Sequence, residues 1–398
     1  NSSNPVLPWY QLYSGDGSYC AVGEGYYYAS AQNGVLFRFA SNNPSTDWAR
    51  VDPEGAEDYI FINPFILDRN NNKMMYLAGG SVLWRNSDLT TIEKYNSDPT
   101  SVNWTKLTNS SIATGAISTL DVSKTPANTI FYATSEGQVY RLNGANSGDP
   151  TPVNITAGSF PGGYISCVSV NPDNADEALI TFANYEVISI WHTNNAGASW
   201  QNISGNLEQN PDGSGNGPSV RWAEILPTDL GTIYLVGTST GLYSTFALNG
   251  TSTVWAQEGT TSIGNVVVDM IDSRTTDDLV VAATHGNGMY SSNVVVSLMD
   301  NPKNIVNNFK LEQNYPNPFN PTTTIDYEIP ESAPVTLKIY DIQGKEIATL
   351  INSDHIAGSY SVNWNGQDRF GRPVASGTYI YQIKAGKNQE SKQMVLMR

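Results

Sequence analysis

The sequence predicts an all-β protein of two domains. Its 398 residues include 34 glycines, 21 prolines and 22 tyrosines, while charged residues make up only 15%. Such a composition is typical of many short strands joined by turns, and long stretches with helical periodicity are absent. The hydrophobic content of 39% is enough for sizeable cores, which argues against wholesale disorder. A proline-rich stretch that begins near residue 316 separates two regions of different kinds.

In the first region, a pattern of three apolar strand-like runs recurs about every fifty residues. The second and third runs form a hairpin signature, which consists of a buried strand, a glycine turn and another strand. This signature is clearest at residues 26–38, 130–141, 233–244 and 279–291. Repeats of this length are typical of propellers and other arrays. Six triplets can be delimited, at residues 18–40, 59–86, 116–142, 164–192, 220–246 and 264–292.

A fourth strand is expected after each triplet, usually marked by a tryptophan. The markers are Trp48, Trp104, Trp200 and Trp255, with Val153 as a weaker match. The sixth sheet would be completed from the other end of the chain, by Trp9–Leu12 paired with residues 289–296. The predicted fold of this region is therefore a six-bladed β-propeller closed by an N-terminal strand. The alternative is an open ring, if Asn1 cuts into a larger propeller.

One connection in the fourth repeat carries a more specific motif. Thr193, Asn195, Gly197 and Trp200 resemble the Asp-box of sialidase-type (BNR) repeats, Ser-x-Asp-x-Gly-x-Thr-Trp. Together with residues 14–19 and 29–38, they indicate a resemblance to the sortilin and xyloglucanase-like repeat superfamily that covers most of residues 9–296. The resemblance implies a structural hairpin on the rim, with Asx side chains bonding the turn and the tryptophan packed between strands. It implies a fold and leaves the activity open.

The net charge of −16 lies entirely in the first region. Residues 1–308 contain 12 basic and 28 acidic residues, whereas residues 309–398 contain nine of each. An acidic surface argues against nucleic acid and anionic membranes as partners, and is compatible with cations or neutral polysaccharides. No run of 18 apolar residues predicts a membrane-spanning helix. No signal peptide is visible and Asn1 is not a start methionine, so the numbering begins after processing or the chain is a fragment.

No catalytic constellation stands out, and we lean toward a protein that is not an enzyme. A glycoside hydrolase needs two carboxylates that face one sugar ring, and the sequence cannot pair its acidic residues across blades. A sialidase would also need an arginine triad, which the scarcity of basic residues disfavours. A secreted carbohydrate-active enzyme remains the alternative function. Acidic residues compatible with a channel or rim position are Glu24, Asp58, Asp121, Glu186, Glu224 and Asp269.

The sequence indicates no metal or other cofactor, apart from one weak calcium candidate. Asp212, Ser214 and Asn216 alternate with glycines, as oxygen ligands do in calcium loops. The simpler interpretation is a solvated turn. Cys20 and Cys167 occupy matching places in repeats one and four, which lie opposite each other in a six-bladed ring. They are too far apart for a disulfide, and we expect two buried free thiols.

The division of the chain follows from these patterns: a propeller at residues 1–296, a linker at 297–310 and a second domain at 311–398. About seven short alternating strands predict an immunoglobulin-like β-sandwich for the second domain. Prolines in its opening stretch remove backbone donors and disfavour a helix or a central strand. Phe319 is expected to pack onto the sandwich. The stretch consists of Asn314, Tyr315, Pro316, Asn317, Pro318, Phe319, Asn320 and Pro321.

This domain resembles type A sorting domains of the type IX secretion system. The matching motifs run in order through residues 311–321, 339–344, 358–366, 375–379 and 392–398. The resemblance implies recognition by the secretion machinery and an outer-membrane shuttle, and a secreted or cell-surface location. The propeller would be the cargo, with a binding, adhesive or structural role toward a glycan, a cell-surface protein or further copies of itself. The alternative is an immunoglobulin-like module with an internal role.

Overall fold

The structure is a computed structural model that describes residues 14–229, 231–294, 309–330, 333–355 and 358–397. Backbone contacts divide the chain into two compact units, Asn1–Asn293 and Val294–Arg398. In the described residues the fold is all-β, as predicted, and no helix is long and apolar enough to cross a membrane. The helices are short 3₁₀ turns: η1 (Leu89–Thr91), η2 (Thr108–Ser110), η3 (Gly205–Leu207) and η4 (Gly250–Ser252).

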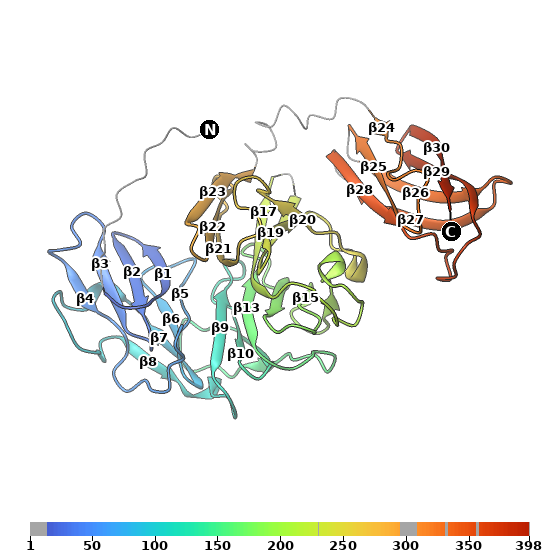
Figure 1. The fold of residues 1–398 in the computed structure, drawn as a ribbon. Coiled ribbons are helices and arrows are strands. Elements are labelled where there is room, and N and C mark those ends of the chain that lie inside the picture. Colours follow the sequence, from blue (N-terminus) through green and yellow to red (C-terminus); the bar gives the residue numbers. More distant parts are fainter. Residues whose placement is uncertain (1–13, 230, 295–308, 331–332, 356–357, 398) are drawn as a thin grey trace. The chain divides into compact units, whose positions relative to one another are not determined.

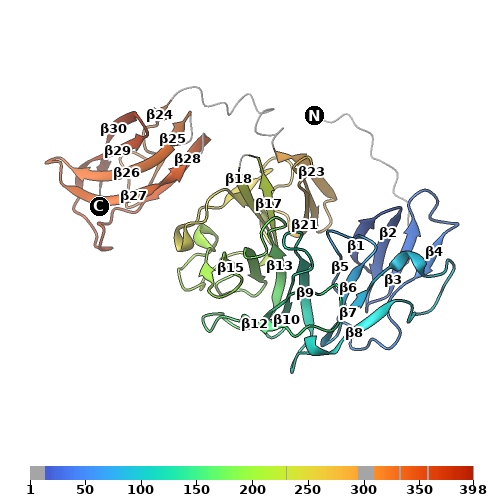
Figure 2. The same ribbon diagram turned by 180° about the vertical axis from the view of Figure 1, so that it is seen from behind.

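The first unit consists of six antiparallel sheets that follow one another along the chain (Figures 1 and 2). Sheet 1 contains β1 (Gly17–Gly23), β2 (Tyr26–Ala31), β3 (Leu36–Ala40) and β4 (Trp48–Arg50). Sheet 2 contains β5 (Phe65–Leu67), β6 (Met75–Gly79), β7 (Val82–Asn86) and β8 (Trp104–Leu107). Sheet 3 contains β9 (Ile117–Val122), β10 (Ile130–Thr134), β11 (Val139–Leu142) and β12 (Val153–Asn154). Sheet 4 contains β13 (Ile165–Val170), β14 (Ala178–Phe182), β15 (Ile190–Thr193) and β16 (Gln201–Asn202). Sheet 5 contains β17 (Val220–Thr228), β18 (Gly231–Thr238), β19 (Gly241–Thr245) and β20 (Ala256–Glu258). Sheet 6 contains β21 (Val268–Arg274), β22 (Leu279–Thr284) and β23 (Met289–Asn293).

Consecutive sheets of this unit pack against each other, and their first strands gather around a common axis. Separate apolar cores fill the spaces between sheets 1 and 2, 2 and 3, 3 and 4, and 4 and 5. The Tyr19 ring of β1 lies 5.9 Å from the Trp222 ring of β17 and 6.2 Å from the Phe65 ring of β5. Contacts between sheets 1 and 5 require that the first strands face one another, which is the propeller arrangement.

The tryptophan markers of the sequence join neighbouring sheets. Trp104, Trp200 and Trp255 stand at or just before the fourth strands of sheets 2, 4 and 5. Each indole N–H donates to the carbonyl of a residue directly after the fourth strand of the preceding sheet, at 2.8–2.9 Å. The acceptors are Val51, Ile155 and Ile203. The recurring tryptophan is therefore an inter-blade contact, which explains why it recurs at the repeat period.

Only three strands of the sixth sheet fall within the described residues. β23 is the last of them, and its predicted partner Trp9–Leu12 lies outside the residues that the structure describes. The expectation for the thiols was half wrong. Both cysteines are free, and Cys167 is buried, but Cys20 is exposed. Because β1 shifts register before Cys20 pairs with Ala29, its first residues do not follow simple alternation.

The second unit is a β-sandwich, as predicted. One sheet has the order β24–β25–β28 and the other β27–β26–β29–β30. A single core lies between them, centred on large side chains such as Phe319, Trp364 and Tyr381. The strands are β24 (Lys310–Leu311), β25 (Thr323–Ile329), β26 (Ala333–Asp341), β27 (Glu346–His355), β28 (Gly358–Trp364), β29 (Gly377–Ala385) and β30 (Asn388–Leu396).

Candidate functional site

The opening stretch of the second unit is bonded to the last strand of the chain. Phe319 donates its N–H to the carbonyl of Val395 at 3.0 Å, and Met397 donates back to the Phe319 carbonyl at 2.9 Å. The Asn317 side chain accepts from the Val395 N–H at 2.9 Å. Gln313 donates to the carbonyl of Gln393 at 2.8 Å. We call this junction the terminal seam. It joins two sequence motifs that lie at opposite ends of the domain.

Two residues of the proline stretch anchor it in the core. Phe319 is 2% exposed, its ring lies 5.6 Å from that of Trp364, and the expectation that it packs onto the sandwich is confirmed. Asn314 is equally buried: its side-chain amide donates to the Thr323 hydroxyl at 2.8 Å, and its backbone N–H donates to the Tyr381 hydroxyl oxygen at 2.9 Å. The other residues are exposed, namely Tyr315, Pro316, Asn317, Pro318, Asn320 and Pro321. The stretch is thus a ridge on the surface of the sandwich, anchored by the buried residues Asn314 and Phe319.

The Asp-box-like turn connects β15 to β16. Thr193 accepts from the N–H of Gly197 at 3.0 Å and donates to Asn195 at 2.9 Å. Asn195 in turn accepts from the N–H of Ser199 at 2.9 Å. Trp200, at the end of the turn, makes the inter-blade contact to Ile155 described above. These contacts serve the backbone of the turn and the adjacent sheet, so the turn's polar groups are used structurally.

A row of polar side chains runs around the axis of the first unit. In β9, β13, β17 and β21 the register shifts at one extra residue near the start of the strand. The third residue after this bulge is Asp121, Ser169, Glu224 or Asp272, in strand order. Because a bulge re-aims the residues that follow, the four positions are equivalent. The repeat therefore brings three carboxyl groups to the axis.

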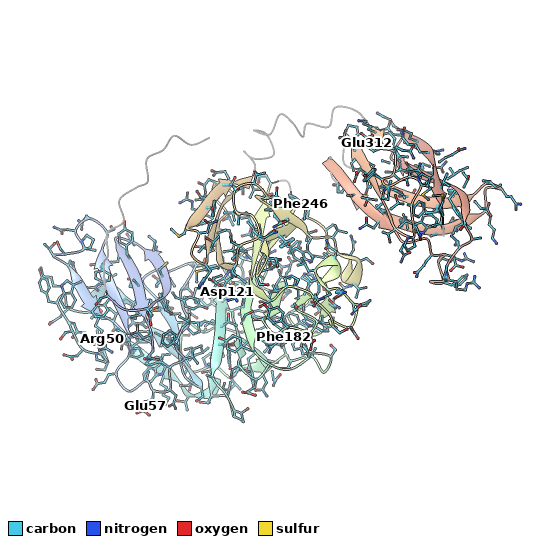
Figure 3. The ribbon with its side chains drawn as sticks, viewed as in Figure 1. Arg50, Glu57, Asp121, Phe182, Phe246 and Glu312 are labelled. Atoms are coloured by element: carbon cyan, nitrogen blue, oxygen red, sulfur yellow. The ribbon has the colours of Figure 1, made fainter. Side chains whose placement is uncertain are left out.

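Asp121, labelled in Figure 3, accepts more hydrogen bonds than the other members of this row. Its carboxylate accepts from the backbone N–H groups of Val122 and Val170, each at 2.7 Å, and from the Arg69 guanidinium at 3.1 Å. Arg69 also donates to the Val122 carbonyl at 2.8 Å. The Asp121 carboxylate raises the pKa of Arg69. With both carboxylate oxygens engaged by protein donors, Asp121 ties sheets 2, 3 and 4 together.

Glu224 continues the row on the far side of Ser169. Burial raises the pKa of Glu224 to about 8; Asp272 adds to the shift and Arg69 opposes it. The Ser273 hydroxyl donates to its Oε1 at 2.6 Å. The protein packed around the axis also raises the pKa of Asp272, although that residue remains accessible to solvent. At neutral pH Glu224 is therefore largely a neutral acid that bridges sheets 5 and 6.

Only two of the six acidic residues singled out in the sequence lie in this row, Asp121 and Glu224. Glu24 is exposed beside Lys73, and Asp58 and Glu186 occupy loop positions with positive φ. Asp269 sits at the bulge of β21, where it pairs with Arg221 at 3.1 Å. Asp272 and Arg69 were missed. The bulge shared by the first strands is the signal that would have indicated Asp272, since it fixes the equivalent position.

The candidate calcium loop forms a turn bonded within itself. The carboxylate of Asp212 accepts from both the N–H and the hydroxyl of Ser214, at 3.0 and 2.7 Å. The N–H of Asn216 donates to Gln209 at 2.7 Å. In the part of the chain that the structure describes, no three His, Cys, Asp or Glu side chains group as metal ligands. Calcium binding by this loop stays an untested expectation.

Comparisons with known proteins address the fold. Residues 319–389 match the FlgD Ig-like domain family. The structure is similar to PorZ, an essential bacterial surface component of the type IX secretion system of Porphyromonas gingivalis, with 16% identity and a TM-score of 0.46. That match covers 96% of this chain and 51% of PorZ, so the chain spans about half of its length.

A second similar structure is the computationally designed protein Ika8. It shares 9% identity over 70% of this chain and 83% of the designed chain, with a TM-score of 0.42. No curated protein matches the sequence. At these values neither structural similarity carries an argument about function. The functional assignment therefore depends on the residues of this chain.

Proposed function

We propose that the protein is exported through a type IX secretion system and acts at the cell surface or outside the cell. Residues 311–398 are the sorting domain, and the propeller is cargo with a binding role. The observation that carries the proposal is the terminal seam, in which the motifs at residues 314–321 and 393–397 form one structure. These are two of the motifs on which the resemblance to type A sorting domains depends.

The seam also supplies a physical reason for a folded signal. Because its two halves are far apart in sequence, the ridge they form exists only after the sandwich has folded. Six of the eight residues in the proline stretch are exposed, and Tyr315 is 80% exposed. Met397, which bonds to Phe319, is 55% exposed. A receptor such as the outer-membrane shuttle would thus meet an accessible apolar surface that reports correct folding.

The test is export of the full chain. It is expressed with a signal peptide for the periplasm in a bacterium that has a type IX system, and the propeller is detected with antibody on intact cells and in the medium. The expected result is detection outside the cell that is lost in a strain without the outer-membrane translocon. A chain that ends at residue 293 serves as control and should stay in the periplasm. Equal export of both chains would refute the proposal.

Hydrolysis of a glycan at the axis is a second candidate, favoured by one observation. A carboxylic acid with a pKa raised to about 8 beside a second carboxyl group is the property of a general acid. Asp121 is a poor partner because its oxygens already accept protein donors. Release of reducing ends from polysaccharides by the purified protein, lost in Glu224→Gln, would establish the enzyme. Absence of any release by the wild type would leave the binding role.

A further inference from the structure

The connection between β16 and β17, residues 203–219, is the longest link between one sheet of the first unit and the next. Connections of this length without regular strands are usually functional. It carries the glycine-rich loop at Asp212–Gly217, which is only a weak calcium candidate by its pattern. Together with Thr240 in the turn from β18 to β19 and Asn265 in the connection from β20 to β21, it lines an open pocket. In an up-and-down sheet these three segments all lie at the end where the first strands begin.

The pocket has a volume of about 600 Å³, within the span of about 300–1,000 Å³ that is typical of ligand sites. Most of its lining residues are polar and uncharged, although Leu207, Pro218 and Tyr243 add apolar surface. Glu208 is the one acidic residue in the lining, and Lys and Arg are absent from it. The Glu208 carboxylate accepts from the N–H of Ser189 at 3.0 Å, and burial raises its pKa. An anionic ligand would find no counter-charge here, so the pocket favours a neutral one.

The glycine-rich loop is shaped to form one wall of the pocket. At Gly213 (φ +84°) an added Cβ would lie 2.3 Å from the N atom of Ile188. At Gly215 (φ +99°) it would lie 2.5 Å from Oε1 of Gln209. The same Gln209 oxygen accepts the N–H of Asn216 at 2.7 Å, which fixes the loop against the side chain. The wall is therefore held in place before any ligand binds, which lowers the cost of binding.

Hydrogen-bond donors on both walls are left without protein partners. Among the described residues, Nε2 of Gln209, Nδ2 of Asn265 and the whole side-chain amide of Asn216 have no hydrogen-bond partner, and all three residues are exposed. Gln257 holds the far wall by donating to Asn265 at 2.8 Å. Tyr243 adds a half-buried ring whose hydroxyl lies 3.2 Å from that of Thr240. Three side-chain NH2 groups without protein partners and one tyrosine suit a ligand rich in neutral oxygen atoms.

From this lining we infer that the pocket is a binding site for a neutral oligosaccharide. The inference rests on the proposed binding role of the propeller and names the ligand class for it. Sugar hydroxyls accept from amide N–H groups and donate to amide oxygens, and a sugar face packs on a tyrosine ring. The site is distinct from the carboxyl groups of the axis, since none of Asp121, Glu224 and Asp272 lines it.

The test is calorimetric titration of the purified full chain with neutral hexasaccharides: cellohexaose, maltohexaose, xylohexaose and mannohexaose. Hexagalacturonate and hexaglycine serve as the anionic and peptide probes. The expected result is saturable binding of at least one neutral hexasaccharide, with the anionic probe much weaker. Gln209→Ala and Asn265→Ala should each weaken it by at least about 3- to 10-fold, because each variant loses a hydrogen bond to the ligand and also one that holds a wall of the pocket. Asn265→Trp, which fills the pocket, should abolish it.

The matched control is Asn146→Ala, an exposed amide in the connection from β11 to β12 that does not line the pocket and should leave binding unchanged. Because the altered amides are exposed, the variants should fold, and their unfolding curves verify this. Binding of none of the neutral probes, binding that Asn265→Trp leaves intact, or binding of hexaglycine alone would each overturn the inference. Export of the chain is a separate readout, so failure of the sugar titration leaves the secretion proposal standing, and the reverse also holds.

Discussion

The first unit distributes its apolar contacts over several cores between consecutive sheets, whereas the second unit has one core that every strand shares. In the first unit, sheet-to-sheet contacts are repeated with local variation, as at Trp104, Trp200 and Trp255. In the second, the first and last segments of the domain are bonded to each other. In a repeated architecture, a substitution in one blade affects mainly that blade and its neighbours. In the sandwich, a substitution in the single core affects every strand. This difference is compatible with the proposed roles, in which the propeller is the cargo and the sandwich is the export signal.

The largest expected effect is in the closed core of the second unit. Phe319→Ala should destabilise the sandwich by about 3–5 kcal/mol, because a fully buried aromatic side chain leaves a cavity. The matched control is Phe370→Ala: Phe370 is 66% exposed and the guanidinium groups of Arg369 and Arg372 lie over its ring, so its loss should cost at most about 1 kcal/mol. Hydrogen exchange read by mass spectrometry separates the two units. If Phe319→Ala also lowered the protection of the first unit, the two units would not be separate in stability, contrary to our description of their cores.

The next effect concerns the polar axis of the first unit. Arg69→Leu should destabilise that unit by roughly 2–3 kcal/mol, because it leaves Asp121 without its cation in a largely enclosed site. The cost stays below that of a fully buried pair, since 27% of the Arg69 side chain is exposed. Arg274→Leu is the control: it removes the exposed pair with Asp277 and should leave denaturant unfolding nearly unchanged. Equal effects of the two variants would argue that the Arg69–Asp121 pair does not stabilise the first unit.

Only part of this picture follows from the sequence. Hairpin turns and tryptophan markers predict the sheets because they recur at a similar spacing in successive repeats. The packing of Phe319 is predictable because it is the one large apolar residue among the prolines. Arg69 is not, since it follows β5 in a polar Leu-Asp-Arg-Asn context typical of a turn. Asp272 is missed because the bulge at Asp269 reverses the alternation on which a strand is interpreted. The terminal seam joins residues almost eighty positions apart, which local patterns cannot indicate.

The pH dependence of the first unit should reveal Glu224. Its pKa is about 8 in the folded protein, above the usual value of about 4.3 in an unfolded chain. The folded state therefore holds more protons between these values, and stability falls as pH rises through this window. Glu224→Gln should remove this part of the fall and raise the melting temperature at pH 8 by on the order of 5 °C.

Glu258→Gln is a control for Glu224, because Glu258 lies on the outer strand β20. Thermal unfolding of both variants from pH 5 to 8 provides the comparison. An unchanged pH slope in Glu224→Gln would show that this carboxyl group is ionised in the folded protein. The result would then contradict its assignment as a neutral bridge between sheets 5 and 6.

The smallest expected effect lies in one inter-blade contact. Trp200→Phe removes the indole donor to the Ile155 carbonyl and should cost about 1 kcal/mol, the net value of a hydrogen bond plus a small packing change. Trp48→Phe is the matched control, because the Trp48 indole nitrogen has no hydrogen-bond partner among the described residues. Denaturant unfolding of the first unit measures both. Equal destabilisation by the two variants would argue that the indole bond adds nothing to the repeat.

The central claim is that the second unit directs export, and the most direct test is whether this unit alone is sufficient to export another protein. Residues 294–398 are attached to a fluorescent reporter with a periplasmic signal peptide and expressed in a bacterium with a type IX system. We expect protease added to intact cells to remove the reporter signal, and the signal to be protected in a strain without the outer-membrane translocon. A reporter that stays protected in both strains, while a native substrate leaves the same cells, would contradict it.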